Sequence, residues 1–246
     1  MYKIIVPYRD RESHLRMFAD NAIPFFEETG REYKIIVVEQ ADGKPFNLGK
    51  LTNIGFDLYR SIDGGFKPED SFVFQPVDCI PYDAHYDAPR GGIAKLASHY
   101  STPRDPDDAL AGILSRRTEW APRASQVVQG EPRPHGVPYF YKAFSVDPVA
   151  YKRVNGFNND CWGWGGEDNE FFIRLSMFNI KTVHRLCLYD MLDHELASLE
   201  FHNKNLNKAN ELLRHCDIYQ SGLNTLQYSV KEQTGRFGIE TYVCEV

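Results

Sequence analysis

The sequence lacks the features that mark several broad classes of protein. Its 28 lysines and arginines are outnumbered by 34 aspartates and glutamates, a net charge of −6, so the basic excess typical of nucleic-acid-binding proteins is absent. The longest apolar run is about five residues, far short of the roughly 20 that a membrane-spanning helix needs. Met1 to Pro7 has the pattern of a buried strand rather than of a secretory signal peptide. We therefore expect neither a nucleic-acid partner nor a membrane span.

Cysteine is scarce and is not arranged in pairs. Five cysteines stand at wide spacings, and no Cys-x-x-Cys motif occurs. An odd number at such spacings argues against a disulfide framework and against a structural zinc site. We expect free thiols in a reducing compartment. The cysteines are Cys79, Cys161, Cys187, Cys216 and Cys244.

Strand and helix patterns alternate over the N-terminal part of the chain. Short β-branched runs alternate with segments of helical spacing, and Pro7 is expected to stop the first strand. This order predicts an α/β fold, an open sheet with right-handed crossovers and with ligands beyond the carboxyl ends of its strands. Two polar clusters, Tyr8–Arg11 and Asp78, fall at those ends. The expected strands are Lys3–Val6, Tyr33–Val38 and Ser71–Phe74, and the expected helices are Glu12–Glu28 and Leu51–Arg60.

The rest of the chain is expected to complete one domain over residues 1–246. The proline-rich stretch from about Tyr86 to His135 reads as an insertion or lid within that domain. No internal repeat or low-complexity segment is evident. Further strands are expected at Tyr139–Val146, Gln227–Lys231 and Gly238–Val243, and further helices at Pro148–Val154, Asn169–Phe178 and Leu206–Cys216.

A segment rich in glycine and tryptophan, Asn155–Glu170, is the most unusual part of the sequence. It packs two tryptophans, four glycines and several carboxylates into sixteen positions. In one interpretation, Trp162 and Trp164 form an aromatic platform for a sugar ring on a mobile loop, and Glu167 and Asp168 perform acid–base chemistry. In the other, the segment is a turn that caps the following helix, with Asp168 as the N-cap.

A second constellation combines Asp78, Met191 and His194. If the chain is helical or turned there, the spacing of three puts Met191 and His194 on one side. A carboxylate, a thioether and an imidazole can share one divalent cation, for which Mn²⁺ is plausible. The alternatives are a turn residue for Asp78, core packing for Met191 and a satisfied surface histidine for His194.

Six sequence blocks occur in an order that is shared with a known family. They are Val6–Leu15, Val38–Gln40 with Phe46–Phe56, Phe72–Pro81, Asn155–Phe157 with Trp162–Asp168, Met191–His194 and Gly222–Leu226. With these blocks the chain resembles the β-1,4-galactosyltransferases, metal-dependent inverting enzymes of glycosyltransferase family 7. The string Trp-Gly-Trp-Gly-Gly-Glu-Asp is the most specific part of the resemblance.

The resemblance implies a GT-A fold, an open sheet with a Rossmann-like N-terminal half and helices on both faces. It implies inverting transfer of a sugar, with galactose as the first choice, from a UDP donor to a hydroxyl of a glycan acceptor. The implied cofactor is Mn²⁺, with Mg²⁺ or another divalent cation as the alternative.

The resemblance also implies roles for single residues. Asp168 would be the general base with Glu167 beside it, and the metal ligands would be Asp78, Met191 and His194. A bulky Tyr139 would disfavour an N-acetyl group on the donor and so favour galactose. The residues that bind donor or acceptor would be Pro7, Tyr8, Arg9, Arg11, Phe46, Val77, Asp78, Tyr139, Trp164, Gly165 and Gly166.

Four places depart from the family's pattern. They are Pro76, Leu48–Gly49, Asn169 and Tyr141–Lys142. These changes touch sugar contacts and leave the implied metal ligands and base in place. UDP-GalNAc or UDP-Glc as the donor therefore remains an alternative, as does a non-catalytic protein that binds a sugar or nucleotide sugar.

Animal members of the family are typically Golgi proteins with a membrane anchor and a stem, and the first expected strand begins at Lys3. We therefore expect a bare catalytic domain, a soluble bacterial or viral enzyme in a reducing cytoplasm. A trimmed piece of a longer protein is the alternative.

Overall fold

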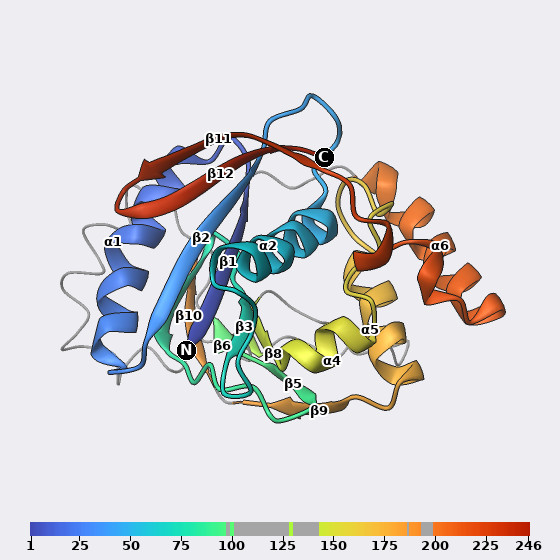
Figure 1. The fold of residues 1–246 in the computed structure, drawn as a ribbon, viewed down its shortest axis with the longest axis horizontal. Coiled ribbons are helices and arrows are strands. Elements are labelled where there is room, and N and C mark those ends of the chain that lie inside the picture. The colour runs from blue at the N-terminus through green and yellow to red at the C-terminus, as the bar shows by residue number, and fades with distance from the viewer. Residues whose placement is uncertain (97–98, 101–127, 130–142, 186, 193–198) are drawn as a thin grey trace.

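The N-terminal part of the chain alternates strands and helices, as the sequence predicts (Figure 1). This computed structural model describes residues 1–96, 99–100, 128–129, 143–185, 187–192 and 199–246. The first helix has the predicted bounds, and Gly30 follows it with the left-handed φ of 64° that closes many helices. The elements are β1 (Tyr2–Tyr8), α1 (Glu12–Glu28), β2 (Tyr33–Gln40), α2 (Leu48–Ile62) and β3 (Ser71–Phe74).

Eight strands of the described residues form one mixed sheet in the order β11-β12-β2-β1-β3-β8-β5-β9. In this sheet β1 lies parallel between β2 and β3, as βαβ crossovers require. By contrast, β8 runs antiparallel to β3, and β11 runs antiparallel to β12. The later strands are β5 (Gly92–Lys95), β8 (Phe144–Val146), β9 (Lys181–His184), β11 (Ser229–Arg236) and β12 (Ile239–Glu245).

A second sheet, which the sequence patterns do not predict, has the order β4-β10-β6-β7 within the described residues. Its strands are β4 (Cys79–Asp83), β6 (His99–Tyr100), β7 (Val128–Gln129) and β10 (Leu188–Met191). The C-terminal half adds the helices α4 (Pro148–Arg153), α5 (Glu167–Met177) and α6 (His202–His215). Single turns of 3₁₀-helix cover Leu199–Phe201, Ile218–Gln220 and Leu223–Thr225.

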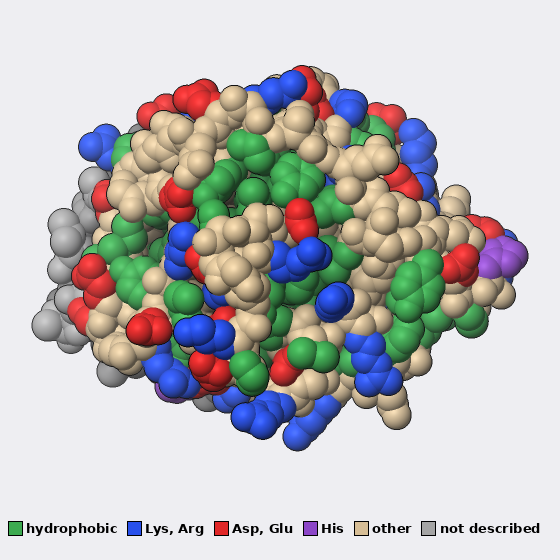
Figure 2. All heavy atoms as spheres, in the orientation of Figure 1, with side chains coloured by type: hydrophobic (Ala, Val, Ile, Leu, Met, Phe, Trp, Pro, Cys, Tyr) green, Lys and Arg blue, Asp and Glu red, His purple; other side chains and the backbone are tan. Residues whose placement is uncertain are grey.

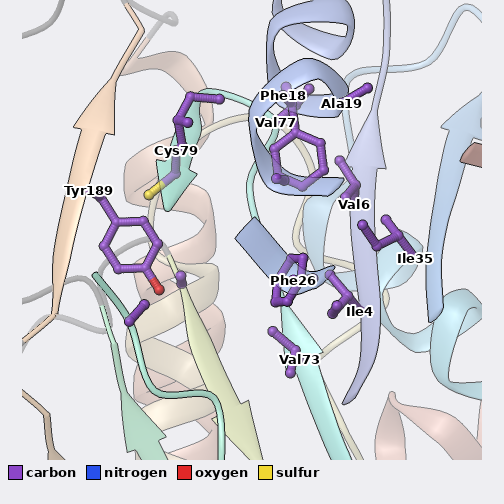
Figure 3. Close-up of a cluster of buried hydrophobic side chains, with 14 of the residues drawn as sticks. Ile4, Val6, Phe18, Ala19, Phe26, Ile35, Val73, Val77, Cys79 and Tyr189 are labelled. Atoms are coloured by element: carbon purple, nitrogen blue, oxygen red, sulfur yellow. The ribbon is translucent and has the colours of Figure 1, made fainter. Parts of the chain in front are cut away.

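Helices cover both faces of the main sheet, which confirms the predicted α/β architecture. Ile4 and Val6 of β1 pack in a buried cluster with Phe18 of α1, as Figure 3 shows. The intervening Ile5 belongs to the cluster on the opposite face, with residues of α2 such as Leu51. Each fully buried side chain of this kind stabilises the fold by roughly 1.5–3 kcal/mol, so the two clusters hold both helices against the strands.

The prediction that Pro7 stops the first strand is wrong. β1 continues through Pro7 to Tyr8, and Pro7 stands opposite Val38 of β2. The carbonyl of Ile5 accepts a hydrogen bond from the backbone N–H of Gln75 at 2.9 Å, so it points toward β3. Backbone groups of alternate residues in a strand point to the same side, and the nitrogen of Pro7 therefore also points toward β3. The paired part of β3 has already ended there. A proline therefore removes no ladder hydrogen bond at this position.

The stretch predicted as an insertion contributes to the main sheet near its start. Residues 92–95 form β5, which pairs with β8 and β9. Tyr86 and Leu96 are buried in the cluster beneath α1. β5 has only four residues, too few to give a clear period in the sequence. Tyr139, Tyr141–Lys142 and most of the predicted lid lie outside the described residues.

Acidic and basic side chains are interspersed on the face of the molecule that Figure 2 shows. No charge of a single sign therefore dominates that face. None of the helices in the described ranges is both long and apolar enough to cross a bilayer. The expected cytoplasmic location and bacterial or viral source stay predictions.

Candidate active site

The carboxyl ends of β1 and β2 bring a first group of predicted residues together. The hydroxyl oxygen of Tyr8 accepts a hydrogen bond from the backbone N–H of Arg11 at 3.2 Å. The Arg9 guanidinium donates to the carbonyl of Lys44 at 2.6 Å and lies 5.5 Å from the ring centroid of Phe46. Arg9 and Phe46 therefore form one wall, which can hold both an aromatic base and an anion.

Asp78 lies beyond β3 at the same edge of the sheet. The Arg11 guanidinium is 3.9 Å from its carboxylate, whose side chain is 11% exposed. The carbonyl of Asp78 accepts a hydrogen bond from the backbone N–H of Leu192 at 2.9 Å. This bond joins the turn between β3 and β4 to the residue after β10, in which Met191 stands opposite Cys79. Two of the three predicted metal ligands, Asp78 and Met191, therefore lie on adjacent segments.

The third predicted ligand, His194, lies outside the described residues. Met191 is the last residue of a strand, so the helical spacing considered for Met191 and His194 does not apply at Met191. Within the described ranges, no three His, Cys, Asp or Glu side chains cluster closely enough to hold a metal ion. The carboxylate of Asp78 and the thioether of Met191 are donors that a borderline divalent cation accepts, so this part of the chain fits such a cation.

A buried network of hydrogen bonds fixes the turn that carries Asp78. The Gln75 amide donates to the carbonyl of Cys79 at 2.5 Å and accepts from the Tyr86 hydroxyl at 2.7 Å. The side chain of Val77 is buried and lies beside Phe18 in the cluster under α1 (Figure 3). Val77, a predicted donor-binding residue, can therefore face a ligand only through its backbone.

The glycines of the Trp162–Gly166 loop are required by close contact with α6. Gly165 and Gly166 have left-handed φ values of 89° and 88°, which residues with a Cβ rarely adopt. A Cβ on Gly165 would overlap the Nδ1 atom of His202. The Asn205 amide donates to the carbonyls of Trp162 at 3.0 Å and Gly165 at 2.8 Å, so α6 holds the loop.

Trp164 is exposed at the surface of this loop. Its side chain is 48% exposed, and its ring stacks on that of His202 with centroids 5.8 Å apart. The Nδ1 atom of His202 is buried and has no hydrogen-bond partner among the described residues. His202 was not predicted from the sequence, because no motif includes it.

Glu167 and Asp168 form the first turn of α5, where Gly166 occupies the N-cap position. The alternative in which Asp168 is the N-cap is therefore wrong. Burial, and then the neighbouring Asp168 charge, raise the pKa of Glu167. Burial also raises the pKa of Asp168, while the backbone N–H of Asn169 opposes that rise by donating to Oδ1 at 2.9 Å. A carboxylate with a raised pKa accepts a proton more readily near neutral pH, as a general base must.

Positive charge near Asp168 comes from residues that the sequence analysis missed. The charges of His202 and of Lys95 on β5 both oppose the rise in the pKa of Asp168. Burial lowers the pKa of Lys95, and the Asp168 carboxylate opposes that change. The proximity depends on pairing between distant strands, so the local sequence holds no sign of it.

A buried ion pair anchors the same helix. The Arg174 guanidinium lies 2.8 Å from the Glu170 carboxylate and donates to the carbonyl of Ser221 at 2.7 Å. Both side chains are 1% exposed. The spacing of four along a helix could have suggested this pair. Removing one partner of such a pair costs roughly 3–5 kcal/mol. The hydrogen bond from Arg174 to Ser221 then holds α5 to the segment that follows α6.

The sequence of the chain is similar to known families and proteins. Residues 2–87 match the family model described as the N-terminal region of glycosyl transferase group 7, and residues 135–195 match the one described as the N-terminal domain of galactosyltransferase. The chain is 27% identical to β-1,4-galactosyltransferase 2 of Mus musculus over 234 residues, 93% of this chain and 55% of that protein. It is 30% identical to β-1,4-galactosyltransferase 4 of Homo sapiens over 183 residues, 74% of this chain and 44% of that protein. The chain thus spans about half the length of these relatives.

Solved structures share the fold. The catalytic domain of Drosophila β-1,4-galactosyltransferase 7, in complex with xylobiose, superposes with a TM-score of 0.66 at 20% identity, covering 100% of this chain and 93% of that one. A mutant of the same enzyme in complex with manganese, UDP-Gal and xylobiose gives a TM-score of 0.67 with the same coverage and identity. These likenesses confirm the predicted GT-A type of α/β fold.

Proposed function

The chain belongs to glycosyl transferase group 7, and from that premise we propose that it transfers galactose from UDP-galactose to a hydroxyl of a glycan acceptor, with inversion and with Mn²⁺. One contact carries the proposal, the 3.9 Å approach of the Arg11 guanidinium to the Asp78 carboxylate at the carboxyl edge of the sheet. It joins a cation suited to a diphosphate with a carboxylate suited to a divalent metal. A pair of carboxyls begins the helix α5 of the same domain.

The donor would be held at the ends of β1 and β2. The uracil ring would lie along Phe46, and the guanidiniums of Arg9 and Arg11 would bind the diphosphate. The 5.5 Å spacing of Arg9 and Phe46 supports this assignment, because one ligand can contact both. Pro7 and Tyr8, which end β1, would supply backbone and ring surface to the same ligand.

Asp78, Met191 and His194 would hold the metal. The backbone hydrogen bond that brings β10 against the Asp78 turn supports the pairing of Asp78 with Met191. When bound, the divalent cation offsets the negative charge that develops on the departing diphosphate. Arg11 would add a second positive charge on the same side. Mn²⁺ is the first choice, and Mg²⁺ is the alternative.

Asp168 would take the proton of the acceptor hydroxyl. A hydroxyl is a poor nucleophile unless its proton is removed in the transition state, and a buried carboxylate with a raised pKa suits that task. A single displacement by the oxygen turns an α-linked donor into a β-linked product. Trp164 would cover the donor and exclude water, which limits hydrolysis. Gly165 and Gly166 allow the backbone of that loop its left-handed turns.

We take the chain as one catalytic domain. The buried cluster beneath α1 supports this, because it includes Ile4 of the main sheet and Tyr189 of the smaller sheet. The preference for galactose rests on Tyr139, so UDP-GalNAc and UDP-Glc belong in the donor panel beside UDP-galactose.

A donor panel and one variant test this function. With Mn²⁺, UDP-galactose should be transferred or slowly hydrolysed, and EDTA should abolish the reaction. Asp168→Asn should lower kcat at least about a hundredfold while UDP affinity, measured by calorimetry, stays unchanged. Asp20→Asn, at an exposed position of α1, is the matched control and should be as active as wild type. If no donor reacts and EDTA has no effect, the chain is a binding protein; near-normal turnover by Asp168→Asn would remove that residue from the role of base.

A further inference from the structure

A pocket of about 560 Å³ lies beside the Trp162–Gly166 loop. Its walls come from Lys44 and Pro45 ahead of α2, from Asp160 and Trp162, and from α6 with the turn before it. None of the residues assigned above to the donor, the metal or the proton transfer lines it. Its volume falls within the roughly 300–1,000 Å³ of small-molecule sites.

The charged residues that line the pocket are mostly basic, although the chain carries a net charge of −6. Its charged lining residues are three lysines, Lys44, Lys204 and Lys208, and one acid, Asp160. Lys204 and Lys208 stand one turn apart on α6, a like-charge spacing that destabilises a helix by a few tenths of a kcal/mol. Figure 2 shows lysine or arginine side chains at the upper right edge, where Figure 1 places the start of α6.

The protein neutralises these ammonium groups unequally. Lys44 lies 3.6 Å from the Asp42 carboxylate and donates to the backbone oxygen of Val246, so it is the best paired of the three. Lys204 pairs with Glu200 at 3.4 Å, but both side chains are 64% exposed, so the pair contributes little. Lys208 forms no ion pair with any residue in the described ranges. Burial, and then the nearby Lys44 ammonium, lower the pKa of Lys50, and the charges of Asp160 and Asp42 oppose that change.

Aromatic rings stand beside two of the ammonium groups. The Lys44 Nζ atom lies 5.6 Å from the ring centroid of Trp162, which is half-buried. The Lys204 Nζ atom lies 5.0 Å from the ring centroid of Phe201. An aromatic face can stack on the C–H face of a sugar, and lysines beside it can bind an anionic substituent.

We propose that this pocket binds an anionic sugar, a pyranose that carries a carboxylate, phosphate or sulfate. The ring would stack on Trp162, and the anionic group would lie between Lys44 and the two lysines of α6. Because Asn205 ties α6 to the loop, a bound sugar would also hold the loop in place. That the sugar belongs to the acceptor glycan rests on the proposed function, whereas binding itself does not.

Binding is tested by NMR titration of the Trp162 indole N–H, assigned with Trp162→Phe. The probes are methyl β-D-glucuronide and glucose 6-phosphate, and methyl β-D-glucoside is the neutral control. Both anionic probes should shift this resonance with an affinity at least about tenfold above that of the neutral glucoside. The affinity should fall with rising salt, as expected for exposed charges.

Variants separate the pocket from general charge effects. Lys204→Glu/Lys208→Glu should weaken glucuronide binding about tenfold or more, and Lys204→Gln/Lys208→Gln should weaken it less. Lys67→Glu/Lys181→Glu makes the same charge change at exposed positions elsewhere and should leave binding unchanged. Equal binding of the neutral glucoside, no binding of either anion, or full displacement of the probes by UDP would overturn the proposal. If the Asp168→Asn variant still binds the anionic probes, sugar binding in this pocket does not depend on catalytic turnover.

Discussion

Glu167 gives the most direct test of the electrostatics at the start of α5. Its Oε2 atom is buried and has no hydrogen-bond partner among the described residues. Burial first, and then the charge of Asp168, raise the pKa of Glu167 from 4.5 to about 8. Glutamine has nearly the same shape and stays neutral at every pH. The Glu167→Gln variant therefore reproduces the protonated form of the folded protein.

The sign and size of the effect follow from proton linkage. A carboxyl with a higher pKa in the folded state contributes stability that is present at low pH and is lost as the pH rises. Between pH 4.5 and about 8, the loss approaches about 1.4 kcal/mol per pH unit, or at most about 5 kcal/mol in total. Residual contact with water reduces this, so we expect about half of it. Glu167→Gln should match wild type at pH 4.5 and exceed it by about 2 kcal/mol at pH 8.

Urea unfolding of both proteins at pH 4.5, 6 and 8 measures this difference. Other carboxyls titrate in both proteins, so the difference between the two curves isolates Glu167. Glu69→Gln, at an exposed position, is the control and should show no pH-dependent difference from wild type. If wild type and Glu167→Gln lose stability in parallel over this range, Glu167 is ionised in the folded protein and the reasoning is refuted.

Three further predictions concern the metal, the loop and the base. His194→Ala should sharply raise the Mn²⁺ concentration needed for half-maximal activity, and an unchanged metal titration would remove His194 from the site. Gly165→Ala should lower stability by about 1–3 kcal/mol in thermal unfolding, because its φ of 89° and the neighbouring His202 ring both oppose a Cβ. A wild-type Tm would show that the loop can shift. Because burial raises the pKa of Asp168, kcat/KM should begin to fall on the acid side above the usual titration range of an aspartate, and a profile that stays flat down to pH 4 would contradict its role.

The sequence was informative where structure depends on neighbours along the chain. The bounds of α1 and the order of the first three strands follow from local periodicity. Pairing between distant segments could not be predicted in this way. β12 returns to lie parallel to β2, and β10 joins β4 to bring Met191 beside the Asp78 turn. Both strand pairings depend on which sheet edges remain free once the rest of the chain has folded. Short strands also show little hydrophobic pattern of their own in the sequence.

Sequence motifs likewise located candidate residues without giving their surroundings. The Trp-Gly-Trp-Gly-Gly-Glu-Asp string led to Trp164 and Asp168. It gave no indication of His202 or Lys95, whose charges act on Asp168 from α6 and β5. For Pro7, the local sequence led to a wrong prediction. Proline usually ends a strand, but it is tolerated in β1 because the paired part of β3 has already ended at that position.

The surroundings, rather than the residue types, decide how the two adjacent carboxyls differ. Four groups favour a charged Asp168, namely the backbone N–H of Asn169, the backbone of Asp168 itself, and the charges of His202 and Lys95. For Glu167, burial and the Asp168 charge favour the neutral form, and only backbone hydrogen bonds at Glu167 and Gly165 oppose them. The two carboxyls titrate as a coupled pair, and these surroundings favour a negative charge on Asp168 over one on Glu167. A neutral Glu167 can donate a hydrogen bond to an acceptor oxygen while Asp168 accepts a proton, so exchanging the two residue types would not exchange their roles.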